Sequence, residues 1–133
     1  MHDDYVLQGR VDLLISGKQG VEVFDFKTGA RVEPDSPWFR VYQQQLYFYA
    51  CALHQSQSAY PERLTLYWTA EERQEDALVE IDFAPEDLAQ IKETLHETIT
   101  QIRQKQFAVK VPPPPMICQT CDARSLCKKE QII

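Results

Sequence analysis

The stretch "GVEVFDFKTG", residues 20–29, combines a strand pattern with two charges that a strand interior does not ordinarily carry. Its valines and phenylalanines suit a half-buried β-strand over residues 21–27. Asp25 and Lys27 are two residues apart and therefore project from the same face of that strand. A carboxylate and an ammonium that project together near a strand end predict a polar site built on a sheet.

A partner strand precedes this stretch. The run "VLQGRVDLLI", residues 6–15, has strand character, and "SGKQG", residues 16–20, supplies glycines for a turn. Two β-type runs joined by a short glycine-containing loop predict a hairpin.

The register of the hairpin decides what the charges do. If the loop is symmetric about Lys18 and Gln19, Asp12 lies opposite Asp25. Opposed side chains in an antiparallel pair have Cβ atoms roughly 4.5 to 5.5 Å apart, and like charges so placed destabilise a sheet. Two carboxylates resolve this by sharing a proton, by gaining a cationic partner or by binding a divalent metal.

Mg²⁺ accepts such a site readily, because it binds one or two carboxylates and keeps several waters. Lys27 on the same face places an ammonium where a bound phosphate would lie. A divalent ion beside an amine is a hydrolytic arrangement, since the ion activates water and neutralises developing charge. The alternative is a solvated hairpin end, in which Asp12, Asp25 and Lys27 form a surface ion cluster of little energetic value.

The rest of the chain alternates helical and strand patterns. Apolar residues at helical spacing predict helices over 40–54 and 84–107, and β-type runs predict strands over 63–70 and 77–83. The order strand, strand, helix, strand, strand, helix predicts a mixed β-sheet flanked by helices, an α/β or α+β fold.

Composition narrows the class of protein. With 133 residues, 44% of them hydrophobic, the chain fits one globular domain of ordinary size. No apolar run approaches the ~20 residues that span a bilayer, and the N-terminus lacks a signal-peptide pattern, so we expect a cytoplasmic protein without a membrane partner. The net charge of −6 argues against nucleic-acid binding by bulk electrostatics, but a nuclease metal site itself needs carboxylates.

Three of the four cysteines crowd the C-terminal end. They form the array "CQTCDARSLC", a C-x2-C-x5-C spacing at Cys118, Cys121 and Cys127. In a cytosolic protein this crowding favours metal binding over disulfides, and the spacing fits both zinc and an iron–sulfur cluster. We expect the fourth, Cys51, to be a small buried residue of the central helix.

Taken in order, these motifs resemble the RecB-like branch of the PD-(D/E)XK nuclease superfamily. "GRVD" at 9–12 and "VFDFKTG" at 23–29 are similar to its two metal-binding motifs. "QQQLYFYA" at 43–50 supplies Gln45 and Tyr49, which resemble its helical glutamine–tyrosine pair. The cysteine array is similar to one found in helicase-nucleases and CRISPR adaptation nucleases of this branch.

The resemblance implies a restriction-endonuclease-like fold and a set of roles. Asp12, Asp25 and the backbone carbonyl of Phe26 would bind one or two Mg²⁺ or Mn²⁺ ions, and Lys27 would be the catalytic lysine. Gln45 and Tyr49 would orient active-site groups or contact DNA. For this pair, ordinary helix packing is the alternative interpretation.

It also implies an activity and partners. We expect a deoxyribonuclease, of exonuclease type, that cleaves single-stranded DNA in repair or recombination together with a helicase domain or subunit. Cys118, Cys121 and Cys127 would hold a [4Fe-4S] cluster whose fourth ligand is not in this chain. The alternatives are zinc with an outside ligand and three reduced free thiols. The rival function is a non-catalytic module that keeps the nuclease fold to bind DNA or to stabilise a helicase assembly.

The resemblance is not complete. The family has a helix ahead of its first motif, and the eleven residues before Asp12 do not provide it. We therefore expect a nuclease core over residues 1–111 without this helix, followed by a Pro-rich linker and cysteine tail over 112–133. This pattern predicts either the C-terminal part of a longer nuclease or a shortened one.

Overall fold

A computed structural model of the chain describes residues 5–106, 113 and 115–129. The chain divides into two compact units, residues 1–94 and 95–133, and each is described here by itself. The predicted boundary between residues 111 and 112 lies outside the described residues.

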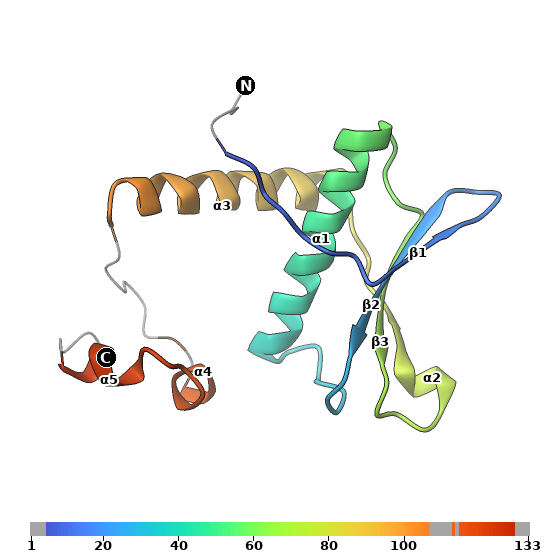
Figure 1. The fold of residues 1–133 in the computed structure, drawn as a ribbon. Coiled ribbons are helices and arrows are strands. Elements are labelled where there is room, and N and C mark those ends of the chain that lie inside the picture. The colour runs from blue at the N-terminus through green and yellow to red at the C-terminus, as the bar shows by residue number, and fades with distance from the viewer. Residues whose placement is uncertain (1–4, 107–112, 114, 130–133) are drawn as a thin grey trace. The chain divides into compact units, whose positions relative to one another are not determined.

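The first unit is built on a four-stranded mixed sheet (Figure 1). Its strands are β1 (Leu13–Ser16), β2 (Val21–Lys27), β3 (Arg63–Trp68) and β4 (Leu78–Glu80), in the order β1-β2-β3-β4. The β1–β2 and β3–β4 pairs are antiparallel, whereas β2 and β3 are parallel. The mixed sheet with helices confirms the predicted α+β class.

The first hairpin has the predicted register. Leu13 pairs with Phe24 and Ser16 pairs with Val21, and the turn is closed by the Gly17 N–H, which donates to the Gly20 carbonyl at 2.8 Å. Continuing this alternation by one residue brings Asp12 level with Asp25, although Asp12 itself lies just before β1.

The first strand is shorter than the predicted 6–15, because it begins only at Leu13. The residues before it turn toward a helix instead. The Tyr49 hydroxyl donates to the Arg10 carbonyl at 2.7 Å, and a Cβ added at Gly9 would lie 3.3 Å from the Tyr49 ring. Contacts with the side chain of Tyr49 on this helix therefore take the place of strand pairing for the residues before Leu13.

The fourth strand is also shorter than the predicted 77–83. Residues Gln74–Ala77 form the short helix α2, and β4 covers only Leu78–Glu80. The Ile81 N–H still donates to the Leu64 carbonyl at 2.8 Å, so hydrogen bonding to β3 continues one residue beyond the end of β4.

Helix α1 (Pro37–Gln57) connects β2 to β3 and extends beyond the predicted 40–54. Ser36 caps it: its hydroxyl accepts from the Trp38 N–H at 3.3 Å, and proline at the first helical position fits the missing N–H. The helix ends at Ser58, whose left-handed backbone (φ 57°) lets its N–H donate to the His54 carbonyl at 2.8 Å.

The core lies between α1 and one face of the sheet. The sheet supplies fully buried Leu64, Leu66 and Trp68, and helix α3 (Pro85–Arg103) adds Leu88 and Ile91. From α1 come five buried side chains: Leu46, Tyr47, Ala50, Cys51 and Leu53. The expected burial of Cys51 is confirmed, with 9% of the residue exposed.

Helix α3 begins where the sequence indicates, since the Asp87 carboxylate accepts from the Ala84 N–H at 2.8 Å. It ends at Arg103, before the predicted residue 107, which lies outside the described residues. In the second unit, two short helices follow, α4 (Pro115–Gln119) and α5 (Arg124–Lys129). Within the described residues, no helix has the length and apolar character needed to cross a membrane.

Candidate active site

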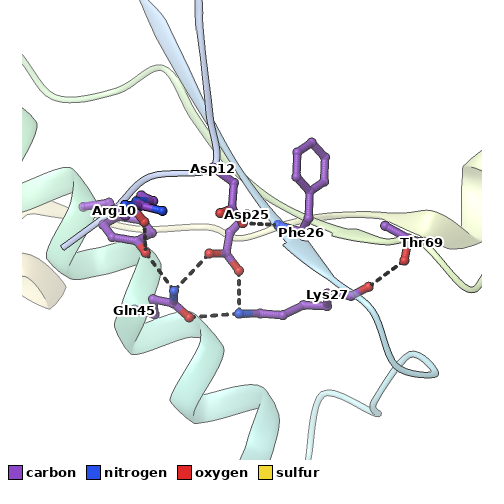
Figure 2. Close-up of polar contacts among 8 residues, drawn as sticks. Arg10, Asp12, Asp25, Phe26, Lys27, Gln45 and Thr69 are labelled. Atoms are coloured by element: carbon purple, nitrogen blue, oxygen red, sulfur yellow. Dashed lines mark hydrogen bonds and ion pairs between the residues drawn. The ribbon is translucent and has the colours of Figure 1, made fainter.

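The end of β2 presents two opposite charges toward helix α1 (Figure 2). Asp25 is only 2% exposed, although it is ionisable, and its Oδ2 lies 2.5 Å from the Lys27 Nζ. Their positions two apart on the strand put them on one face, as predicted from the sequence. A charge buried to this degree requires a partner, and Lys27 supplies it.

Gln45 joins these two groups from α1. Its Oε1 accepts from the Lys27 Nζ at 2.9 Å, and its Nε2 donates to Asp25 Oδ1 at 3.0 Å. The carboxamide therefore uses its acceptor on the amine and a donor on the acid. This pattern fixes its orientation, because a flipped amide would place like groups against each other.

Tyr49 lies one helical turn beyond Gln45 on the same face of α1. Its hydroxyl accepts from Gln45 Nε2 at 2.8 Å and donates to the Arg10 carbonyl at 2.7 Å. Tyr49 also packs against the hydrophobic core, so its ring has a packing role while its hydroxyl belongs to the polar network. The network connects the N-terminal segment, α1 and the end of β2.

Asp12 approaches the same strand from the other side of the hairpin. It is exposed, and its Oδ2 accepts from the Phe26 N–H at 2.8 Å. Asp12 is thus bonded to the amide that directly follows Asp25. The Phe26 ring is 41% exposed, and Figure 2 shows it pointing away from Lys27 and Gln45.

Comparison with known families agrees with this arrangement. The sequence matches the PD-(D/E)XK nuclease superfamily over residues 2–128. The chain belongs to this superfamily. Its mixed sheet with flanking helices is consistent with the restriction-endonuclease-like fold of PD-(D/E)XK nucleases. No curated protein matches the chain. Membership implies a nuclease that acts on DNA, and nucleases of this superfamily generally use divalent metal ions.

The donors at the end of β2 fit a divalent ion of the kind PD-(D/E)XK nucleases use. Asp25 Oδ2 is buried and, apart from its ion pair with Lys27, has no hydrogen-bond partner among the described residues. Carboxylate oxygens are the ligands that Mg²⁺ and Mn²⁺ prefer. The described part of the chain contains no group of three or more His, Cys, Asp or Glu side chains that could hold a metal.

One contact of Lys27 was not predicted from the sequence. Lys27 Nζ lies 4.2 Å from the centroid of the Tyr42 ring. A signal was available, because Tyr42, Gln45 and Tyr49 follow the i, i+3, i+7 spacing of one helical face. The Arg10 carbonyl that orients Tyr49 was missed as well, and no sequence pattern identifies a main-chain acceptor.

The cysteine array lies in the second unit of this nuclease chain. Cys121 is exposed, Cys118 and Cys127 are half-buried, and all three are free thiols. They do not form a group that could hold a metal as the described residues are arranged. The inference that these cysteines hold a metal cluster therefore rests on their spacing in the sequence.

Proposed function

We propose that this chain is the catalytic part of a metal-dependent deoxyribonuclease. Asp12, Asp25 and the Phe26 carbonyl bind one or two Mg²⁺ or Mn²⁺ ions, and Lys27 is the catalytic lysine. The observation that carries the proposal is the Asp25–Lys27 pair, bridged by Gln45 on a buried strand face. A surface ion cluster would be solvated, whereas Asp25 is 2% exposed and Lys27 has 14% of its side chain exposed.

Each residue of the candidate active site has a distinct role in this proposal. An ion held by Asp12, Asp25 and the Phe26 carbonyl would supply an activated water and would neutralise charge on the phosphate. Lys27 stabilises the charge that develops on the phosphoryl oxygens, and its ammonium is available for this once Asp25 has another positive partner. Gln45 holds the acid and the amine at a fixed separation, and Tyr49 keeps Gln45 in its orientation.

The finer features come from the RecB-like motifs. We propose single-stranded DNA as the substrate, exonucleolytic cleavage, and a role in repair or recombination beside a helicase domain or subunit. The Gln45–Tyr49 spacing and the C-x2-C-x5-C array support this assignment. The array would take part in a [4Fe-4S] cluster with a fourth ligand from outside this chain.

Cleavage of end-labelled oligonucleotides tests the activity. Single-stranded and duplex DNA, labelled at either end, are incubated with the chain and Mn²⁺, and with Lys27→Met and Asp25→Asn. Asp35→Ala is the matched control, because Asp35 is an exposed carboxylate in the loop before α1. We expect shortening of single-stranded DNA by the wild type and the control only. Cleavage that persists in both site variants would contradict the proposal.

A non-catalytic DNA-binding or assembly module is the second candidate. It is favoured by two observations: Lys27 forms an ion pair with Asp25, and the described residues provide no side-chain group of three or more metal ligands. Fluorescence anisotropy with labelled single-stranded DNA separates the two functions. The module predicts DNA binding that is unchanged by Asp25→Asn and by chelation of metal, together with an absence of cleavage.

A further inference from the structure

Within the described residues, the Lys27 ammonium has three polar or cation–π contacts, and they differ in kind. Asp25 Oδ2 lies 2.5 Å away, Gln45 Oε1 accepts at 2.9 Å, and the Tyr42 ring centroid is 4.2 Å away. The face of an aromatic ring attracts a cation, and it does so more strongly when the two are desolvated than at an exposed site. With only 14% of its side chain exposed, Lys27 belongs nearer the desolvated limit.

The Tyr42 ring is held independently of the lysine. Trp38, one turn earlier on α1, stacks on it with centroids 6.4 Å apart and an interplanar angle of 24°. Trp68 meets it edge-on at 5.6 Å and 69°. Trp68 is 1% exposed and is the strand partner of Lys27 across β2 and β3. Packing of the two tryptophans therefore sets the position of the ring.

The three contacts also respond differently to a metal ion at Asp25. The ion pair competes directly with the metal, because both use the same carboxylate. Gln45 donates to that carboxylate as well, so its position is coupled to Asp25. The Tyr42 ring has neither dependence, since its aromatic and cation contacts within the described residues are with Trp38, Trp68 and Lys27.

We propose that Tyr42 is a positioning residue, which keeps the Lys27 ammonium in the active site when Asp25 exchanges the lysine for a metal ion. This inference rests on the proposed nuclease function. It assigns the aromatic face a task that neither Asp25 nor Gln45 can perform alone in the loaded state.

Proton NMR of Lys27 tests the contact without any reaction. Protons above an aromatic ring are shifted upfield, so the Lys27 side-chain signals nearest Nζ should be upfield, with assignment from their absence in Lys27→Met. We expect this shift to persist at saturating Mg²⁺, while the carboxyl carbon-13 signal of Asp25, recorded on a labelled sample, moves. It should vanish in Tyr42→Leu and remain in Tyr60→Leu, a control tyrosine that stacks on His54 at 4.0 Å. Loss of the upfield shift when Mg²⁺ binds would overturn the proposal.

A fluorinated series tests the electrostatic origin without changing shape. Tyr42 is replaced by phenylalanine and by phenylalanine analogues with one, two and three ring fluorines, which progressively weaken the negative face of the ring. We expect kcat for single-stranded DNA to fall along the series, by about 2- to 30-fold in total, with KM and the Mn²⁺ dissociation constant unchanged. A flat series would contradict a cation–π role even if Tyr42→Leu were inactive through misfolding.

The two arms separate this inference from the nuclease proposal. If the wild type cleaves no DNA, the nuclease proposal fails, and the NMR arm still decides whether Tyr42 retains Lys27 in the presence of Mg²⁺. If the wild type cleaves and the Lys27 signals move to their solvent-exposed positions on adding Mg²⁺, the nuclease proposal stands and the role of Tyr42 fails.

Discussion

Lys27 Nζ lies 2.5 Å from Asp25 Oδ2, and the two residues are separated by a single residue on strand β2. The ammonium lies against the carboxylate oxygen that accepts no hydrogen bond among the described residues, while Gln45 donates to the other oxygen. In the absence of metal, this ion pair provides a charge partner for the Asp25 carboxylate, whose side chain is 97% buried. In the proposed enzyme, metal binding and release of the lysine are one equilibrium.

The exchange predicts an unusual phenotype for Lys27→Met. Removing one partner of a buried ion pair leaves an uncompensated charge, and costs about 3 to 5 kcal/mol. Without metal, the variant should have a free energy of unfolding lower by roughly this amount. Because the competing amine is gone, Mn²⁺ should bind at least as tightly as in the wild type and should restore much of the stability, since a ligand of the native state stabilises it.

Urea unfolding with and without Mn²⁺, read by circular dichroism, measures both effects. Cleavage by Lys27→Met should remain at least about 100-fold below wild type even with metal bound, the range expected for losing one charge-stabilising group. If Lys27→Met without metal has the same free energy of unfolding as the wild type, the loss of Lys27 does not leave a buried and uncompensated charge on Asp25.

Gln45 and Tyr49 should act as one unit. Gln45→Met keeps the size of the side chain and removes hydrogen bonds to two charged groups, each worth about 1.5 to 3 kcal/mol. We expect a loss of activity of roughly 10- to 100-fold. Tyr49→Phe removes the hydroxyl that orients Gln45 and should cause a smaller loss.

A double-mutant cycle on kcat measures the coupling between them. In the double variant, the loss caused by Tyr49→Phe should largely disappear, because Gln45 is no longer there to be oriented. Additive losses would mean that the Tyr49 hydroxyl acts independently of Gln45.

We expect the free energy of unfolding to depend on pH through Tyr47, a residue outside the candidate active site. Burial, followed by the charge of Asp87, raises the pKa of Tyr47 from its usual value of 10.0. The folded state thus favours the neutral phenol, whose hydroxyl donates to the Asp82 carbonyl at 2.9 Å. This stabilisation is complete below pH 10.0 and is lost as the pH rises through the folded pKa.

Tyr47→Phe isolates this contribution. At neutral pH the variant should be less stable by about 1 kcal/mol, the value of a typical buried hydrogen bond. Above pH 10.0 the difference between wild type and variant should narrow, since only the wild type loses the contribution of this phenol. Urea denaturation at several pH values measures the difference, and a constant gap would show that the phenol does not titrate with folding.

The four thiols should react in two classes. Burial raises the pKa of Cys51, whose Sγ is 3.6 Å from the Leu88 carbonyl, so that little thiolate is present near neutral pH. Cys118, Cys121 and Cys127 are exposed or half-buried. A thiol-specific chromogenic reagent should label these three quickly and Cys51 only on unfolding.

The same assay tests the proposed cluster. After anaerobic reconstitution with iron and sulfide, protection of the three fast thiols together with a brown colour would support a [4Fe-4S] cluster. Protection by zinc without colour would favour zinc, and three thiols that stay fast in both treatments would contradict a metal at this array.

Local patterns in the sequence were sufficient for the sheet and the hairpin. The glycine-containing turn fixed the pairing of Leu13 with Phe24, and strand alternation put Asp25 and Lys27 on one face. The extent of the first strand was not predictable, because it depends on a hydrogen bond from Tyr49 to a backbone carbonyl thirty-nine positions away in the chain. Such long-range contacts have no local signature.

The site was predictable to a similar degree. Residue types and spacing indicated the two acids, the lysine and the Gln45–Tyr49 pair. The cation–π contact of Tyr42 was not predicted, since it depends on where α1 crosses the end of β2. The sequence did not decide whether Lys27 would form a direct ion pair with Asp25 or lie apart from it.

Calorimetric titration with Mn²⁺ tests the central claim most directly, because it measures metal binding at the paired acids without requiring a DNA substrate. Wild type, Asp25→Ala and the exposed control Asp35→Ala are compared under identical conditions. The account predicts micromolar binding by the wild type and the control, and loss of that binding in Asp25→Ala. Binding of equal strength and stoichiometry in Asp25→Ala would contradict it.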